Sequence, residues 1–237
     1  MRLLLGSGGL ITPERREAWK NELNDFLGAI SRVTFLPYAG GDYTAYMKRV
    51  AELDLAAGRK VEGLHEAKNL LAEIVKAECI FVGGGNSFRL LADLYRLNLL
   101  DAIQERVRAG IPYLGISAGT NMACPTMKTT NDMPITYPPS LGALGFIPFQ
   151  INPHYFTGAV HYESPAGLTK YGGETRDDRL REFHEMNDTV VVGLTEGSIL
   201  RIEGNRASLR GTSFCRIFRK GQPSEDRSTG SDLSDLL

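Results

Sequence analysis

The sequence lacks the features of several protein classes. Its 237 residues carry a net charge of -1, without the basic excess that nucleic acids and anionic membranes attract. The apolar N-terminal run, residues 1–5, is too short for a signal peptide, and no stretch approaches the length that spans a bilayer. These absences predict a soluble cytoplasmic protein that binds a small molecule and has no nucleic-acid or membrane partner.

Cysteine is also scarce. The three cysteines, Cys79, Cys124 and Cys215, are odd in number, lie far apart and fall in or near apolar runs. They form no recognisable disulfide or zinc framework. We therefore expect buried thiols, a reducing compartment, and no metal or cofactor.

Apolar runs alternate with helical patterns over the first half of the chain. Strands are expected at residues 2–5, 33–37, 60–64 and 79–82, with a helix after each. This order predicts an α/β fold with a mostly parallel central sheet, right-handed crossovers and helices on both faces. Three later apolar runs predict a C-terminal antiparallel extension at residues 198–202, 207–210 and 215–218.

Two segments differ in composition from the rest. Residues 155–173 are rich in Gly, Pro, Tyr and polar side chains, which predicts a long irregular segment of the kind that forms lids. Beyond Lys220 the chain is rich in Ser, Asp, Glu and Gly. We expect one α/β domain over residues 1–220 and a disordered acidic tail over 221–237.

A serine lies at a predicted sharp bend between a strand and a helix. Residues 115–119 read GISAG, after an apolar run and before a short helix that Pro125 ends. Such a turn strains the serine backbone, and glycine two residues to either side leaves room for it. The pattern predicts a nucleophilic Ser117, with the amide of Ala118 as half of an oxyanion hole. The pattern alone also arises by chance, so its context has to support it.

Three consecutive glycines follow the strand at residues 79–82. They form either a plain turn or a loop whose amides, those of Gly84 or Gly85, bind a substrate oxygen. The strand that carries them is expected beside the Ser117 strand. Ligands of open α/β sheets bind at the carboxyl ends of the strands, which favours the second interpretation.

Another glycine-rich turn, GSGG at residues 6–9, follows the first strand. A dinucleotide fingerprint would need a third glycine where Ile11 stands, and no P-loop lysine follows. A plain turn is favoured. The alternative is that the turn binds a flavin or nucleotide and that the protein is a binding module without enzymatic activity.

A serine nucleophile needs a base and an orienting carboxylate. Of the four histidines, His154 is the best candidate because a strand gives way to a loop there. Asp132 gives the order Ser, Asp, His of α/β-hydrolases, and Glu196, at a strand end, is the second choice. An Asp that caps a turn remains an alternative role for Asp132.

Several short runs together resemble peptidase E, the α-aspartyl dipeptidase family of serine peptidases. These runs are GGGNSF at 83–88, GISAGTN at 115–121, CPT at 124–126, TTNDMPI at 129–135, QINPH at 150–154 and GETR at 173–176. The resemblance implies a flavodoxin-like three-layer sandwich related to class I glutamine amidotransferases, with serine in place of their cysteine. It also implies cleavage of dipeptides, and of some amides and esters, with an N-terminal aspartate and without a cofactor.

The resemblance also implies roles for particular residues. Ser117 matches the family nucleophile and His154 the general base, while Asp132 and Glu196 both match acids proposed for the third position; we favour Asp132. Arg176 matches the residue that holds the aspartyl carboxylate, and a planar guanidinium suits that ligand. A peptidase for β-aspartyl chains such as cyanophycin, and a non-enzymatic flavodoxin-like module, are the alternative functions.

Overall fold

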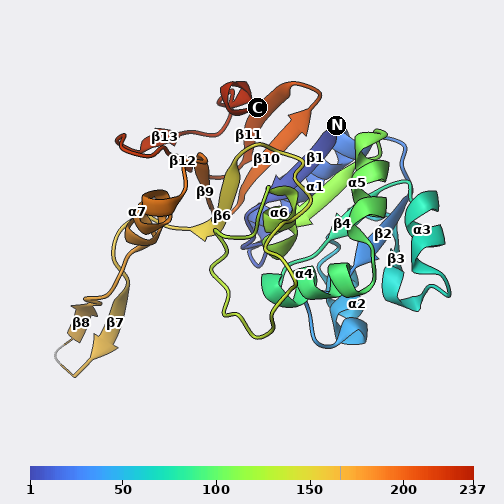
Figure 1. The fold of residues 1–237 in the computed structure, drawn as a ribbon, viewed down its shortest axis with the longest axis horizontal. Coiled ribbons are helices and arrows are strands. Elements are labelled where there is room, and N and C mark those ends of the chain that lie inside the picture. Colours follow the sequence, from blue (N-terminus) through green and yellow to red (C-terminus); the bar gives the residue numbers. More distant parts are fainter. Residues whose placement is uncertain (166) are drawn as a thin grey trace.

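The computed structural model describes residues 1–165 and 167–237, and a seven-stranded sheet lies at its centre (Figure 1). The strand order is β11-β10-β1-β5-β4-β2-β3. These strands are β1 (Arg2–Gly6), β2 (Arg32–Leu36), β3 (Lys60–Gly63), β4 (Ile80–Val82), β5 (Tyr113–Ile116), β10 (Ser198–Glu203) and β11 (Arg206–Gly211). The first five are parallel, and β10 and β11 are antiparallel. The predicted α/β fold with a mostly parallel sheet is confirmed.

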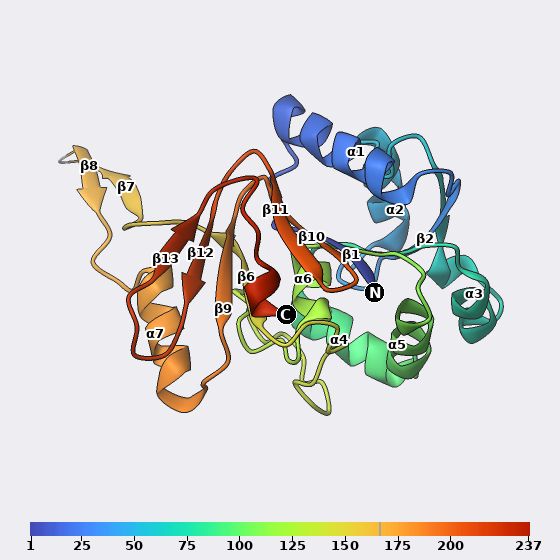
Figure 2. The same cartoon turned by 90° about the horizontal axis from the view of Figure 1, so that it is seen from above.

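Helices cover both faces of this sheet (Figure 2). On one face lie α1 (Pro13–Leu27) and α2 (Tyr43–Glu52); on the other lie α3 (Leu70–Lys76), α4 (Ser87–Arg96), α5 (Leu100–Arg108) and α6 (Ala118–Ala123). The path from β1 to β3 crosses the sheet in one direction, and the path from β3 to β5 returns. Right-handed crossovers in opposite directions place their helices on opposite faces.

The apolar residues of β1 show why both faces need cover. Leu4 packs with Trp19 of α1, whereas Leu3 and Leu5 belong to the core on the other face. Successive side chains of a strand point to opposite sides of the sheet, so a continuous apolar run requires helices on both.

A second sheet, in the order β13-β12-β9-β6, packs beside α6. Its strands are β6 (Gln150–Tyr155), β9 (Val191–Thr195), β12 (Cys215–Phe218) and β13 (Glu225–Arg227). The predicted antiparallel extension is therefore divided, because β10 and β11 extend the central sheet while β12 joins the second sheet.

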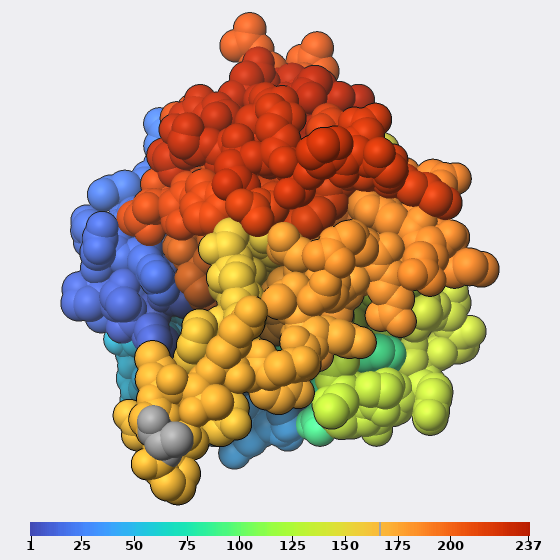
Figure 3. All heavy atoms as spheres, turned by 90° about the vertical axis from the view of Figure 1, so that its left-hand side faces the viewer, coloured from blue at the N-terminus to red at the C-terminus, as the bar shows by residue number. Residues whose placement is uncertain are grey.

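The segment predicted to be irregular contains a hairpin. Strands β7 (His161–Ser164) and β8 (Gly167–Lys170) pair with each other and project from the body beside α7 (Arg176–Met186), as Figures 1 and 3 show. Their apolar side chains, including Tyr162 and Leu168, are exposed. No residue of the strands β7 and β8 is buried, so the usual alternation of apolar and polar residues is missing from their sequence.

The structure also differs from the predicted disordered tail. Residues 221–237 contain β13 and a 3-10 helix, η2 (Ser234–Leu236), and Leu233 is fully buried. Asp226 pairs with Arg216 of β12 at 2.6 Å. These long-range contacts could not be predicted from the composition, because two buried leucines, Leu233 and Leu236, and a few ion pairs do not stand out in a polar segment. Within the described part of the chain, no helix combines the length and the apolar character needed to cross a membrane.

Candidate active site

The bend at Ser117 has the strained geometry that its sequence predicts. β5 ends at Ile116 and α6 begins at Ala118, and Ser117 between them has φ 55° and ψ -109°. A Cβ at Gly115 would lie 2.6 Å from the carbonyl oxygen of Gly119, and a Cβ at Gly119 would collide with the carbonyl oxygen of Val82. Both flanking glycines are therefore required by close backbone contacts.

An imidazole and a carboxylate form a series of hydrogen-bond contacts with this serine. Nε2 of His154 lies 2.7 Å from Oγ of Ser117, and Nδ1 lies 2.6 Å from Oε1 of Glu196. His154 is near the end of β6, and Glu196 follows β9 directly. These two strands are parallel neighbours, so their carboxyl ends bring both side chains to the same edge of the second sheet.

Glu196 is held in its charged form. The hydrogen bond from His154 lowers the pKa of the Glu196 carboxyl against the opposing effect of burial, and the charge of Arg15 adds to the lowering. An ionised carboxylate on Nδ1 fixes the tautomer whose Nε2 can accept a proton from a hydroxyl.

Asp132, our first choice for the orienting acid, is not at the imidazole. Its Oδ2 accepts hydrogen bonds from the backbone amide and the hydroxyl of Ser87, both at 2.7 Å, and from Thr130 Oγ1 at 3.0 Å. The carboxylate thus binds the first amide of α4, where unpaired helix N–H groups favour an anion. Asp132 therefore lies where it caps the start of α4. Glu196, the second choice for the orienting acid, is the carboxylate that contacts His154.

The glycine-rich turn after β1 lies under the imidazole and the carboxylate. Oγ of the fully buried Ser7 accepts from the amide of His154 at 2.8 Å and donates to the carbonyl of Leu194 at 2.7 Å. A Cβ at Gly8 would collide with the His154 ring, and a Cβ at Gly9 would collide with the Glu196 carboxylate. This role cannot be predicted from the sequence, because the only local signal is the glycines themselves.

The glycine loop after β4 faces the serine. A Cβ at Gly84 would lie 3.1 Å from Cβ of Ser117, so the loop passes directly beside the nucleophile position. Within residues 1–165 and 167–237, the amides of Gly85 and Ala118 donate to no protein acceptor. The three residues predicted for an oxyanion hole therefore lie at or beside Ser117, and none of their three amides has a protein acceptor among the described residues.

Arg176 is a half-buried cation without an acidic partner in the described part of the chain. It is the first residue of α7 and stacks over the ring of Phe156, 5.4 Å from its centroid. Its buried Nε has no hydrogen-bond partner among the described residues. Burial, followed by the charge of Arg179, lowers the pKa of its guanidinium. A cation with unused donors is suited to an anionic ligand.

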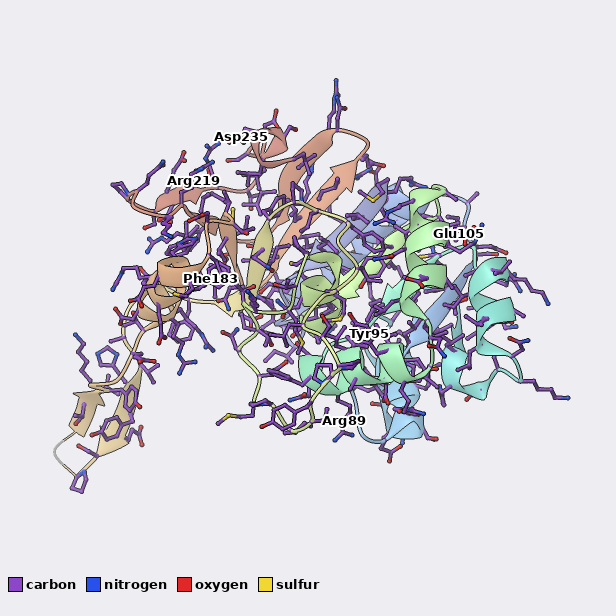
Figure 4. All side chains as sticks on the ribbon, in the orientation of Figure 1. Arg89, Tyr95, Glu105, Phe183, Arg219 and Asp235 are labelled. Atoms are coloured by element: carbon purple, nitrogen blue, oxygen red, sulfur yellow. The ribbon has the colours of Figure 1, made fainter. Side chains whose placement is uncertain are left out.

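Arg176 lines the smaller of two neighbouring cavities that share part of their walls. The smaller, of about 60 Å³, is lined by Arg176 together with Asn131 and Asn152. Asn131 donates to the carbonyl of Pro153 at 2.7 Å, which links this cavity to His154. The larger cavity, of about 600 Å³, lies between α4 and α7. Phe183 of α7, labelled in Figure 4, lines both cavities, as do Lys128, Thr130 and Arg179. Among the described residues, no group of three His, Cys, Asp or Glu side chains could hold a metal ion.

A hydroxyl, an imidazole and a carboxylate joined in this order at the ends of strands define the class of serine hydrolases. The comparisons with known proteins agree. The model of Peptidase family S51 matches residues 2–210, and the chain belongs to this family of serine-type peptidases.

Known relatives align with almost the whole chain. This chain is 51% identical to a peptidase E of Streptomyces coelicolor, over 90% of this chain and 84% of that protein. It is 40% identical to a probable alpha-aspartyl dipeptidase of Drosophila melanogaster, over 99% and 96% respectively. The solved structure of a peptidase from an acI-B1 actinobacterium shares the fold, with a TM-score of 0.67 at 18% identity, over 98% of this chain and 96% of that chain.

Proposed function

We propose that this protein is a serine dipeptidase that hydrolyses dipeptides with an N-terminal aspartate, Asp-X, to aspartate and X. One observation carries the proposal: the hydrogen-bonded Ser117–His154–Glu196 chain is linked to a small polar cavity through Asn131, which lines the cavity and donates to the carbonyl of Pro153. Arg176 lines the same cavity and has no acidic partner among the described residues. The names of the Streptomyces and Drosophila relatives support the same substrate. The three buried, unpaired cysteines agree with a cytoplasmic location.

The reaction begins with Ser117 as nucleophile. Its Oγ attacks the peptide carbonyl carbon while Nε2 of His154 takes the hydroxyl proton, and the carboxylate of Glu196 stabilises the imidazolium that forms. The amide of Ala118 and an amide of Gly84 or Gly85 bind the negative oxygen. The C–N bond then breaks, and His154 gives its proton to the leaving amine.

A water molecule completes the cycle. It transfers a proton to His154 and attacks the ester carbon of the acyl-enzyme, which releases aspartate and restores the Ser117 hydroxyl. The role of Arg176 is to bind the β-carboxylate of the substrate through paired N–H···O contacts. Asp132 takes no part in proton transfer and supports the start of α4.

A panel of four dipeptides tests the substrate. Asp-Leu, Asn-Leu, Ala-Leu and β-Asp-Leu are supplied to the purified protein, and amine release is followed. Asn-Leu is the sharpest control, because it has nearly the shape of Asp-Leu but lacks the charge that Arg176 would bind. We expect kcat/KM for Asp-Leu to exceed that for Asn-Leu by on the order of a hundredfold.

Three outcomes would contradict the proposal. Equal rates with Asp-Leu and Ala-Leu would exclude recognition of the carboxylate. Faster cleavage of β-Asp-Leu would favour a β-aspartyl peptidase. A coloured protein that carries a flavin and hydrolyses none of the four would favour the binding module.

A further inference from the structure

A tyrosine side chain of α2 contacts the glycine loop that follows β4. Tyr46, on α2, donates a hydrogen bond from its hydroxyl to the carbonyl of Gly84 at 2.7 Å. Its ring packs edge-on against Phe35 of β2, with centroids 5.1 Å apart and an angle of 81° between the rings. A helix and a strand thus fix the position of this hydroxyl under the loop.

The loop is shaped around that hydroxyl. A Cβ at Gly83 would collide with the Tyr46 oxygen and lie 2.7 Å from Cζ of Phe35. Gly85 has φ 129°, and a Cβ there would collide with the carbonyl oxygen of Ala39. The first glycine makes room for the tyrosine, and the third adopts a backbone conformation that other residues rarely take.

The hydrogen bond fixes the direction of one peptide group. In a planar trans peptide the carbonyl and the N–H point in opposite directions, and the carbonyl of Gly84 belongs to the same peptide as the N–H of Gly85. Because the carbonyl points toward Tyr46, the N–H points away from it. The backbone of Gly85 is exposed, and its amide has no protein acceptor in the described chain.

We propose that Tyr46 is a positioning residue for catalysis: its hydroxyl holds the Gly84–Gly85 peptide so that the N–H of Gly85 points at the substrate oxyanion. This inference rests on the proposed function and extends it, because it selects Gly85 over Gly84 as the second donor. Burial raises the pKa of the Tyr46 phenol, so the hydroxyl keeps its donor proton at neutral and moderately alkaline pH.

The substitution Tyr46→Phe removes only the hydroxyl oxygen. The amide of Gly85 remains but is free to rotate, so the loss should be smaller than the hundredfold or more that follows deletion of an oxyanion donor. We expect kcat for Asp-Leu to fall on the order of tenfold with KM nearly unchanged. Tyr43→Phe is the matched control: it lies on the same helix, and its hydroxyl contacts Asp93 at 3.3 Å instead of the loop.

An inhibitor separates this role from a merely structural one. The α-aminoboronic acid analogue of aspartate forms a bond between its boron and Oγ of Ser117, the hydroxyl proton passes to His154, and a boronate oxygen occupies the oxyanion position. Free aspartate forms no bond with Ser117 and therefore presents no tetrahedral oxyanion. We expect Tyr46→Phe to lower the affinity for the boronate on the order of tenfold, as much as it lowers kcat. The affinity for aspartate should stay unchanged.

The outcomes are distinguishable. Unchanged kcat in Tyr46→Phe, or a lower kcat with wild-type boronate affinity, overturns the inference and leaves the proposed function intact. A wild-type protein without Asp-Leu hydrolysis overturns both. If Tyr46→Phe is too unstable to assay, Gly83→Ala takes its place, because its methyl group would displace the tyrosine hydroxyl. We expect Gly83→Ala to bind the boronate more weakly while its affinity for aspartate stays the same. An unchanged ratio of the two affinities contradicts the proposal.

Discussion

The carboxylate of Glu196 lies 2.6 Å from Nδ1 of His154, although 42 residues separate the two in the sequence. The same imidazole reaches Ser117 through its other nitrogen. Asp132, which belongs to a longer family motif, instead contacts Ser87 and Thr130. Spatial position therefore favours Glu196 as the residue that orients His154.

A pair of isosteric substitutions tests this choice. Glu196→Gln should lower kcat for Asp-Leu by a factor on the order of 10³ to 10⁴, because the wrong imidazole tautomer would face Ser117. Asp132→Asn should lower kcat by no more than several-fold but reduce the free energy of unfolding by about 1 kcal/mol, because it weakens the start of α4. Steady-state kinetics and urea unfolding of both variants measure this, and the reverse ranking of kcat would contradict the assignment.

Ser7 connects the two strands that carry His154 and Glu196. Ser7→Ala leaves the amide of His154 and the carbonyl of Leu194 without this partner, and should reduce the free energy of unfolding by about 1–3 kcal/mol. Because the imidazole would shift, kcat should fall on the order of tenfold or more. Ser31→Ala, an exposed position, is the control. A Ser7→Ala protein with wild-type kcat and stability would show that the hydroxyl is dispensable.

Arg176 should account for the preference for aspartate. Arg176→Ala should lower kcat/KM for Asp-Leu on the order of a hundredfold and remove the advantage over Asn-Leu. Arg176→Lys should recover only part of this loss, since an ammonium keeps the charge but not the paired geometry. Arg210→Ala, on β11 at the edge of the central sheet, is the control. An unchanged ratio of Asp-Leu to Asn-Leu in Arg176→Ala would assign specificity to another group.

The start of α7 should be sensitive to acid. Hydrogen bonds from Thr175, with a further contribution from Arg181, lower the pKa of Asp178 from 3.8 to about 2. Because folding favours the ionised carboxylate, its stabilising effect is complete above the usual pKa and is lost as the pH falls toward 2. The Tm difference between wild type and Asp178→Asn should be constant above about pH 5 and shrink below pH 4. A difference that grows on acidification would contradict the capping role.

The parts of the fold that the sequence predicts are those fixed by local patterns. The parallel strands are continuous apolar runs, and Thr12 and Pro13 mark the start of α1, where Oγ1 of Thr12 accepts from the amide of Arg15 at 3.4 Å. The β7–β8 hairpin and the C-terminal segment are different. The strands β7 and β8 have no buried residue, and β13 depends on pairing with β12, so neither leaves a local pattern in the sequence.

The residues of the site also fall into those that a local motif predicts and those that long-range pairing positions. Ser117 and the glycine loop follow from short motifs, because strain and close backbone contacts demand glycine at fixed spacings. The position of Glu196 depends on the parallel pairing of β6 with β9, in which Pro153 is opposite Leu194. That register is a long-range property, and a single sequence gives no measure of it. The support from Ser7 is long-range for the same reason.

The most direct test of the central claim is the rate at which Ser117→Ala releases aspartate from Asp-Leu, measured beside the wild type with calorimetric binding of Asp-Leu to the variant. The account predicts that kcat falls by a factor on the order of 10⁴ or more while Asp-Leu still binds, because the binding groups remain in place. Aspartate release by Ser117→Ala at the wild-type rate would contradict it.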